Sequence, residues 1–268
     1  MKKIRFVAVV LLLQIAAIAG LSCRNQPSEA DKSLGQNEKA LAPEMIAQAD
    51  QLYSQREDLS KVRLGVALLR QARTADYGSY EATWKLARIS YYLGAHTDDE
   101  REREEAFREG IEAGKTAVQV STEKPEGHFW LGANYGGSAE QSMLAGLSSI
   151  EDIRREMEAV LKIDEQFQAG SAYMVLGQLY LEAPRLLGGD YRKALEYLEK
   201  GLKFGKNNAL LRLRLAEAYH DANRDADARK QIDFLLKTTP DPDYVPEHKE
   251  AVDKAKKLLE KMNGTKER

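Results

Sequence analysis

The chain has 268 residues, of which 43% are hydrophobic, 7% aromatic and 31% charged, and its formal net charge is −2. This composition is rich in helix-forming residues, and the length suits one or two domains. The charge is close to neutral and no basic stripe with interleaved aromatic residues occurs, so we do not expect a nucleic-acid-binding protein.

Residues 1–22 have the order of a secretory signal peptide. The basic start, Met1–Arg5, is followed by an apolar run from Phe6 to Leu13 that resumes after Gln14. The run is shorter than the ~20 apolar residues that span a bilayer, and Gln14 interrupts it. We therefore expect a cleaved leader over residues 1–22 rather than a transmembrane anchor.

Cys23, the only cysteine of the chain, stands directly after this leader. The preceding Gly20-Leu21-Ser22 resembles a bacterial lipoprotein box, with its leucine one residue nearer to the cysteine than is usual. The resemblance implies that Cys23 is lipidated, and the following Arg24, where other lipoproteins have aspartate, implies sorting to the outer membrane. The alternative is an inert cysteine behind an ordinary cleavage site. On the lipoprotein interpretation the protein is anchored on the periplasmic side of the envelope, and the polar residues 23–42 form a flexible tether.

Beyond this tether, a leucine followed by a small or aromatic residue recurs in a helical setting. The spacings between these leucines are 34, 45, 45 and 39 residues, which is a 34-residue period with insertions in three units. Self-similarity at this period is typical of a solenoid of helical hairpins. The five occurrences are Leu52-Tyr53, Leu86-Ala87, Leu131-Gly132, Leu176-Gly177 and Leu215-Ala216.

The last repeat gives the clearest pattern. Leu215 and Tyr219 share one face of a first helix, and the small Ala216 lets a second helix cross closely. We expect Asp225 to cap that second helix and Pro240 to end the unit. The order resembles the tetratricopeptide pattern, which implies a repeat of two antiparallel helices.

The other units keep the pattern but have longer connections. We expect one loop to begin at Gly136-Gly137, and another to run from Pro184 to Asp190, where the next helix starts. A final amphipathic segment, residues 246–262, has the character of a capping helix. The predicted fold is therefore all-α: a right-handed superhelix of about five tetratricopeptide-like hairpins plus the cap, about eleven helices over residues 43–262, with a short tail at 263–268.

Motifs for chemistry are missing from the sequence. The four histidines are scattered, and no His-Glu-x-x-His, nucleophile elbow, phosphate loop or dinucleotide fingerprint occurs. We interpret Gly188-Gly189-Asp190 as an inter-helix turn, since no strand precedes it, and the acidic run at residues 98–102 as a solvated helix start. The sequence therefore predicts neither an enzyme nor a cofactor or metal site.

The face of each first helix opposite the repeat leucine should line the inner surface of the superhelix. Two residues before the last four of these leucines stands a column of large apolar side chains, whereas the first unit has Asp50 there; other candidate positions lie two and five residues after the leucine. Two interpretations remain open: a groove that binds an apolar ligand or a partner helix, or ordinary core. The column is Trp84, Phe129, Met174 and Leu213; the accompanying positions are Arg88, Tyr91, Ala133, Gln178, Leu181, Glu217 and His220.

The segment from Gly127 to Gly136, the turn Leu186–Asp190 and the leader together resemble the T component of TRAP transporters, the tripartite ATP-independent periplasmic systems. The resemblance covers residues 43–262. It implies a lipid-anchored periplasmic protein that binds a solute-binding protein, holds an apolar ligand in a channel and self-associates, as in a trimer.

Two functions of different classes follow. The first is a transport-associated component in which the apolar column lines a continuous cavity for a hydrophobic small molecule. The second is a general protein–protein scaffold of the envelope, in which the polar positions of a shallower groove contact a peptide or helix.

Overall fold

The computed structural model describes residues 29–140 and 143–264, and within these ranges it contains eleven α-helices, two 3-10 helices and no strand. The all-α prediction is confirmed. The helices are α1 (Glu29–Tyr53), α2 (Leu59–Ala75), α3 (Tyr80–His96), α4 (Glu100–Val120), α5 (Pro125–Ala139), α6 (Met143–Ile163), α7 (Phe167–Glu182), α8 (Tyr191–Phe204), α9 (Ala209–Asp221), α10 (Asp225–Lys237) and α11 (Val245–Gly264), with 3-10 helices η1 (Arg185–Leu187) and η2 (Pro242–Tyr244).

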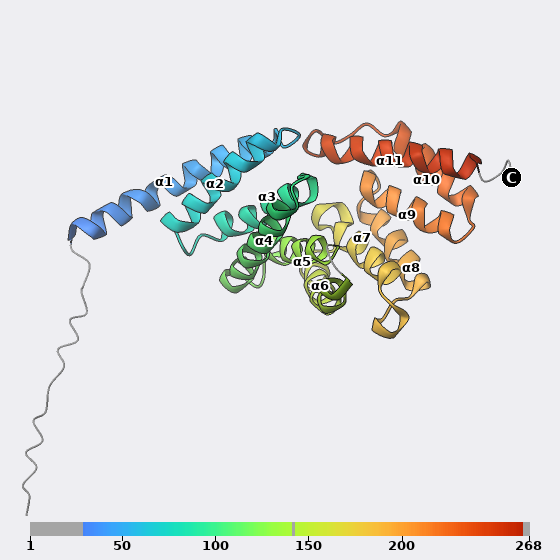
Figure 1. Cartoon of the computed structure of the whole chain (residues 1–268), viewed down its shortest axis with the longest axis horizontal. Helices are drawn as coiled ribbons and strands as arrows, with labels where there is room; N and C mark the ends of the chain where they lie inside the picture. Colours follow the sequence, from blue (N-terminus) through green and yellow to red (C-terminus); the bar gives the residue numbers. More distant parts are fainter. Residues whose placement is uncertain (1–28, 141–142, 265–268) are drawn as a thin grey trace, which may run out of the picture.

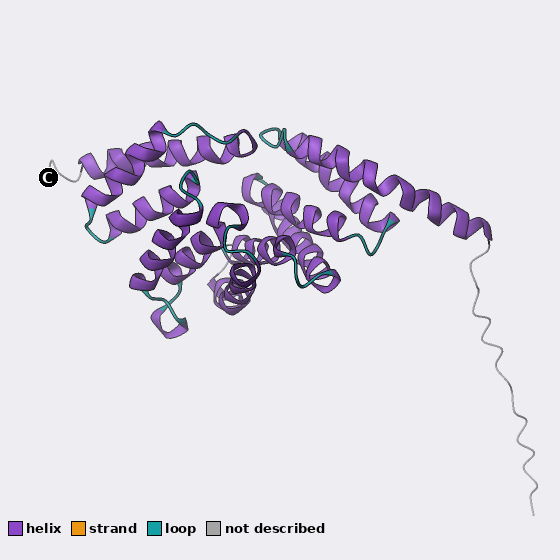
Figure 2. Ribbon diagram, turned by 180° about the vertical axis from the view of Figure 1, so that it is seen from behind, coloured by secondary structure: helices purple, strands orange, loops and turns teal. Residues whose placement is uncertain are grey.

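Consecutive helices form five antiparallel hairpins, α1–α2 to α9–α10, and α11 packs against α9 and α10. The predicted five repeats with a C-terminal cap are therefore confirmed. The hairpins follow a strongly curved path, with α1 and α2 at one end of the arch and α10 and α11 at the other (Figure 1). Seen from either side, the turn between α1 and α2 adjoins the start of α11 (Figure 2). The array thus curves until its two ends meet.

Helix starts are fixed by short polar side chains. Asp190 caps α8 as expected, since its carboxylate accepts hydrogen bonds from the backbone N–H groups of Arg192 and Lys193. The corresponding expectation for Asp225 is wrong. Asp225 is the first residue of α10, and its carboxylate binds the imidazole of His220 at 2.8 Å instead of a free N–H group. A side chain inside the first turn cannot take the position of the cap that precedes it.

Small residues let the paired helices approach each other. A Cβ placed at Gly177 would lie 2.6 Å from Cγ of Leu198, so only glycine fits this crossing of α7 and α8. The same reasoning corrects the expected loop at Gly136-Gly137. Helix α5 continues to Ala139, and a Cβ at Gly137 would collide with the ring of Phe107. This glycine serves close packing rather than a turn.

The buried apolar side chains divide into two groups along the array. The first runs from Ala42 in α1 to Ala194 in α8, and the second from Leu198 in α8 to Met262 in α11. Helix α8 contributes to both, so the core is continuous in sequence while each hairpin packs mainly on its neighbours, as expected for a solenoid.

The ends of the chain differ in part from expectation. Helix α1 begins at Glu29, so residues 29–42, expected as tether, are helical, and α11 extends two residues into the expected tail. The predicted leader and Cys23 lie outside the described residues. Among the described helices, none is long and apolar enough to cross a bilayer.

Candidate functional site

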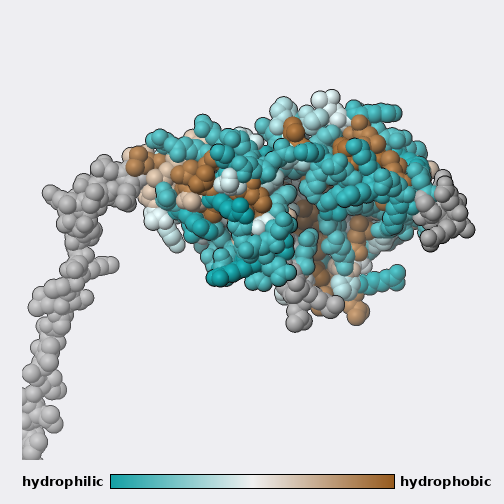
Figure 3. Space-filling model, turned by 45° about the horizontal axis from the view of Figure 1, so that its top comes forward, coloured by the Kyte–Doolittle hydropathy of each residue, from teal (hydrophilic) through white to brown (hydrophobic). Residues whose placement is uncertain are grey.

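The apolar column predicted from the sequence is divided between core and surface. Phe129 is 6% exposed and Leu213 only 1%, and both belong to the buried groups described above. Trp84 and Met174 are partly exposed. On the face drawn in Figure 3 the surface is mainly hydrophilic, and hydrophobic residues appear in separate areas. Two of the four positions therefore follow the core interpretation.

Among the predicted polar positions, Arg88 is the one that contacts both a carboxylate and aromatic rings. Its guanidinium donates to Asp50 at 2.8 Å and lies over the rings of Tyr53 and Trp84, 4.0 and 5.1 Å from their centroids. Its Nε is buried and has no hydrogen-bond partner among the described residues. Cations over aromatic faces are stabilised by the ring quadrupole. The first two repeats thus bring a cationic side chain and aromatic rings together on this surface.

The side chains at the remaining predicted positions pack in the core or bind neighbouring side chains. Tyr91 packs between the rings of Phe107 and Trp130, and burial raises the pKa of its hydroxyl to about 12. Ala133 is buried, and Leu181 packs against both groups of core residues. The other three side chains each bind a neighbour three to five residues away: Gln178 binds Glu182 at 2.9 Å, Glu217 binds Arg214 at 3.0 Å and His220 binds Asp225 at 2.8 Å.

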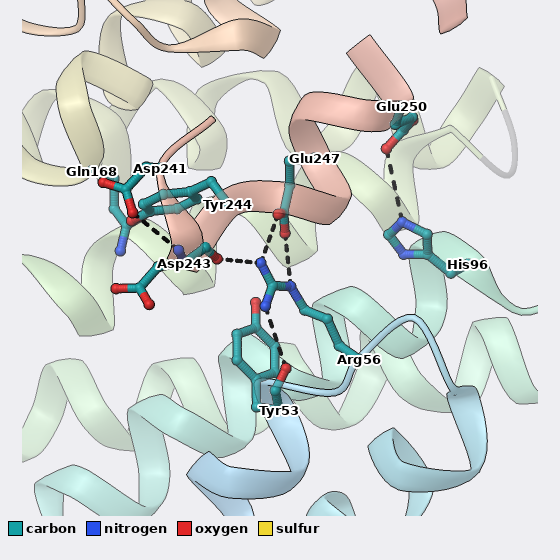
Figure 4. Close-up of polar contacts among 9 residues, drawn as sticks. All are labelled: Tyr53, Arg56, His96, Gln168, Asp241, Asp243, Tyr244, Glu247 and Glu250. Atoms are coloured by element: carbon teal, nitrogen blue, oxygen red, sulfur yellow. Dashed lines mark hydrogen bonds and ion pairs between the residues drawn. The ribbon is translucent and has the colours of Figure 1, made fainter. Parts of the chain in front are cut away.

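The contact that joins the two ends of the array was not foreseen from the sequence (Figure 4). Arg56, in the turn after α1, donates to both carboxylate oxygens of Glu247, at 2.9 and 2.6 Å, and to the backbone carbonyl of Asp243. Its side chain is only 5% exposed and stacks 4.8 Å from the ring centroid of Tyr53. A bidentate arginine–carboxylate pair of this kind fixes orientation as well as charge.

A second basic side chain, His96, faces the same helix. The imidazole of His96, at the end of α3, stacks 3.9 Å from the ring of Tyr92, donates from Nδ1 to the Tyr92 carbonyl and places Nε2 3.9 Å from Glu250. Burial alone would lower the pKa of His96, but Glu250 and the Tyr92 carbonyl outweigh it, so the pKa is raised. The pKa of Glu250 is lowered to about 2, chiefly by His96 and also by Lys254.

Two further contacts complete the junction. The Tyr244 hydroxyl donates to the side chain of Gln168 at 2.7 Å, and Lys249 pairs with Glu57 at 3.1 Å. Gln168 itself lies in a left-handed stretch at the start of α7, which continues to Gly170. We call residues 241–250 the closing segment. We call the side chains of Tyr53, Arg56, Arg88, Tyr92 and His96 the receiving surface.

The only hint of this junction in the sequence is the acidic run Asp241-Pro242-Asp243 before the last helix. Its partners stand almost two hundred residues earlier, as the 191-residue separation of Arg56 and Glu247 shows. No local pattern predicts a contact over that distance.

Elsewhere the described residues show little that could support catalysis. No group of three or more histidine, cysteine or carboxylate side chains gathers there as a metal site would require. Two open depressions of about 300 and 460 Å³ lie on the surface between α6 and α8 and around η1. Of the predicted groove residues, only Leu181 borders either of them.

Comparisons with solved structures agree on the repeat architecture. A thermophilic tetratricopeptide-repeat protein of Thermus thermophilus, TTC0263, is 21% identical, covers 81% of this chain and 98% of its own, and superposes with a TM-score of 0.54. The PilF protein of Pseudomonas aeruginosa is 17% identical over 82% of this chain and 93% of its own, with a TM-score of 0.53. At these identities the likeness concerns the fold.

Comparisons of the sequence identify the family. No curated protein matches the chain. Residues 185–245 match the tetratricopeptide repeat, and residues 45–186, just over half of the chain, match the family described as regulator of microtubule dynamics protein 1-3. The protein is thus a helical repeat protein of tetratricopeptide type and belongs to the regulator of microtubule dynamics protein 1-3 family.

Proposed function

We propose that this protein is a non-enzymatic scaffold that binds a partner protein on the inner surface of its first two repeats. The observation that carries the proposal is the setting of Arg88, which is partly exposed, lies over Tyr53 and Trp84 and pairs with Asp50. Arginine and large aromatic side chains dominate the binding energy of protein interfaces. Solenoids use their curved inner surfaces in this way.

A protein segment suits this surface better than an apolar small molecule. A hydrophobic channel would need the apolar column to be open along its length, whereas Phe129 and Leu213 are taken up by the core. What remains accessible combines the aromatic ring of Trp84 with charged groups such as Arg88 and Asp50. A mixed surface of this kind recognises a polypeptide, which supplies backbone carbonyls and charged side chains together. The proposal therefore does not include an apolar ligand.

We further propose that the protein acts on the periplasmic side of a bacterial envelope, anchored through lipidated Cys23. The support is the order of residues 1–23 in the sequence. Mass spectrometry of the mature N-terminus tests this part. A diacylglyceryl-modified Cys23 would support the anchor, and an unmodified chain cleaved before residue 20 would contradict it.

The resemblance to the TRAP T component adds a candidate partner, a periplasmic solute-binding protein. Its support is the segment from Gly127 to Gly136, the turn Leu186–Asp190 and the leader. In the structure the first lies in α5 and the second joins α7 to α8 through η1. The general scaffold function stands without this finer assignment.

Site-specific photocrosslinking in the native host tests the scaffold function. A photoreactive phenylalanine analogue at Trp84 should give a discrete protein adduct, and the added substitution Arg88→Ala should abolish it. The matched control is the same analogue at Tyr77, an exposed aromatic residue in the loop before α3. Equal adducts at both positions, or an adduct at Trp84 that is insensitive to Arg88→Ala, would contradict binding at this surface.

A further inference from the structure

The closing segment is acidic, and the surface on which it lies is cationic and aromatic. Asp241, Asp243, Glu247 and Glu250 fall within ten residues, against one lysine and one histidine. Facing them are the buried guanidinium of Arg56 and the imidazole of His96. Charge complementarity of this kind, at the meeting of two distant parts of a chain, is what a binding site for a separate acidic segment would also require.

Arg88 belongs to the receiving surface because it shares the ring of Tyr53 with Arg56. The two guanidinium groups lie 4.0 and 4.8 Å from the centroid of that ring. Arg88 thus places a second guanidinium beside the one that binds the closing segment.

The closing segment can leave without dismantling the cap. From Ala251 onward, α11 is held on α9 and α10 by apolar side chains, of which Ala251, Ala255 and Met262 are fully buried. Before Ala251 it is joined to the first two repeats by ion pairs and hydrogen bonds, to Arg56, Glu57 and His96. Water can replace polar contacts of this kind at small net cost, whereas it cannot replace apolar burial.

We propose that the receiving surface is a binding site for an acidic segment of a partner protein, and that the closing segment occupies this site as an internal competitor when the partner is absent. The inference rests on the proposed function, because it names the chemistry of the same partner. The partner can bind only to molecules in which the array is open. Its apparent affinity is therefore its intrinsic affinity reduced by the open fraction.

The contacts of the closing segment define what the partner must offer. One backbone carbonyl accepts from Arg56, a carboxylate four residues later forms the bidentate pair with it, and a second carboxylate three residues further faces His96. Glu247 and Glu250 are three residues apart and therefore share one face of a helix. The fitting partner is thus the start of a helix with acidic residues at positions i and i+3, where acids also favour the helix dipole.

A peptide with the sequence of residues 238–252, carrying a fluorophore at its N-terminus, provides the probe. Its binding is measured by fluorescence anisotropy to the full chain and to the double variant Glu247→Gln, Glu250→Gln, in which the internal competitor is weakened. We expect the double variant to bind the peptide about tenfold or more tightly than the unaltered chain. Equal affinity of the two proteins would overturn the proposal.

Two variants separate the site from the competitor. Adding Arg56→Gln to the double variant leaves the array open but removes the bidentate donor, so peptide binding should be lost; retained binding would overturn the assignment of the site. Glu109→Gln is the matched control, because Glu109 forms a bidentate pair with Arg70 between α2 and α4, away from the junction. It should bind the peptide as the unaltered chain does. Circular dichroism establishes that every variant is folded.

A reversible lock tests the competition directly. Glu57 and Lys249 pair through the ends of their long side chains across the junction, so cysteines at these two positions, with Cys23→Ser, can be joined by a bifunctional methanethiosulfonate linker that reduction releases. The linked chain should not bind the peptide and the reduced chain should. Binding by the locked chain would overturn the proposal.

The lock also distinguishes this inference from the proposed function. A locked chain that still gives the Trp84 adduct would contradict the internal competitor and leave the scaffold function standing. Peptide results as expected, with no adduct at Trp84, would leave the acidic site standing and contradict the scaffold function.

Discussion

The two ends of α11 contact the rest of the array in different ways. The C-terminal part buries Ala251, Ala255 and Met262 completely against α9 and α10. The N-terminal part joins the opposite end of the array through the pairs of Glu247 with Arg56 and Glu250 with His96. One helix thus carries an apolar contact with its neighbours in sequence and a polar contact with the most distant repeats.

This difference between the apolar and the polar contact indicates which of the two persists when the array opens. Burial of a large apolar side chain such as Met262 stabilises by about 1.5–3 kcal/mol and that of an alanine methyl by about 0.8 kcal/mol, and no interaction with water compensates the loss. A polar contact exchanges with hydration, so its net contribution is about 0.5–1.5 kcal/mol for a typical hydrogen bond. We therefore expect the C-terminal part of α11 to remain docked while the N-terminal part opens and closes.

The largest effect should come from breaking the apolar contact. Ala255 has no exposed surface. Ala255→Asp places a charge without a partner in the core and overfills the site, which should lower the free energy of unfolding by about 4 kcal/mol or more. Urea denaturation measures this loss. A loss below about 1 kcal/mol would contradict the view that α11 is anchored here.

A buried ion pair inside a repeat gives an intermediate effect. His128 is 8% exposed, and its ring nitrogens face the Glu156 carboxylate at 2.7 Å and the Thr122 carbonyl at 3.1 Å. Glu156→Gln leaves His128 buried with a weaker acceptor and should cost about 1–3 kcal/mol in urea denaturation.

The same pair should make stability depend on pH. Glu156, above all, raises the folded-state pKa of His128 above its unfolded value of 6.5. Its stabilisation is therefore fully present below pH 6.5 and is lost as pH rises through the raised pKa. The melting temperature should fall over this range, and the fall should be smaller in Glu156→Gln. An equal fall in both proteins would contradict the assignment.

A smaller effect on global stability is expected at the junction. Glu247→Gln weakens the pair with Arg56, but opening of the array lets Arg56 reach water, so the loss in free energy of unfolding should be about 1 kcal/mol or less. Amide hydrogen exchange should accelerate at residues 245–250 and remain unchanged at residues 251–262. Equal acceleration in both parts would show that α11 moves as one unit. Glu109→Gln serves again as the control.

The smallest expected effect is the dependence of closure on pH through the pair of His96 and Glu250. The charge of Glu247 also acts on His96, and that of Lys254 on Glu250. The contribution of Glu250 is present above its unfolded pKa of 4.5 and is lost as pH falls toward about 2. That of His96 is present below 6.5 and is lost as pH rises through its raised pKa. Hydrogen exchange at residues 245–250, corrected for its intrinsic pH dependence, should be slowest between about pH 4.5 and 6.5. The minimum should disappear in His96→Gln.

Local signals in the sequence predicted most of the fold. The spaced leucines, the small residue beside each of them and Asp190 act over one helix crossing or one helical turn, so the repeats and a helix start could be predicted directly. The predicted loop at Gly136-Gly137 was wrong because glycine occurs both in turns and at close helix contacts. Only the contact of Gly137 with Phe107 distinguishes the two. Residues 29–42 were expected to be a flexible tether but are helical, because a polar composition does not exclude a helix.

The candidate site was predicted only in part. Arg88 was selected because its position in the repeat places it on the inner face. The same rule placed Phe129 and Leu213 there, yet the curvature of the array and the packing of neighbouring helices bury them. Arg56 and Glu247 meet because five hairpins together bring the two ends into contact. Such a contact depends on the sum of all the repeat angles, which no single repeat encodes.

The central claim, that a polar and reversible contact closes the array, is tested most directly by a distance across the junction. Spin labels at the exposed positions Gln55 and Val245, the latter within the closing segment, report this distance by double electron–electron resonance in a chain that also carries Cys23→Ser. The unaltered chain should give a short main distance, and the variant Glu247→Gln, Glu250→Gln should add a longer population while its circular dichroism is unchanged. Identical distance distributions in the two proteins would contradict the account.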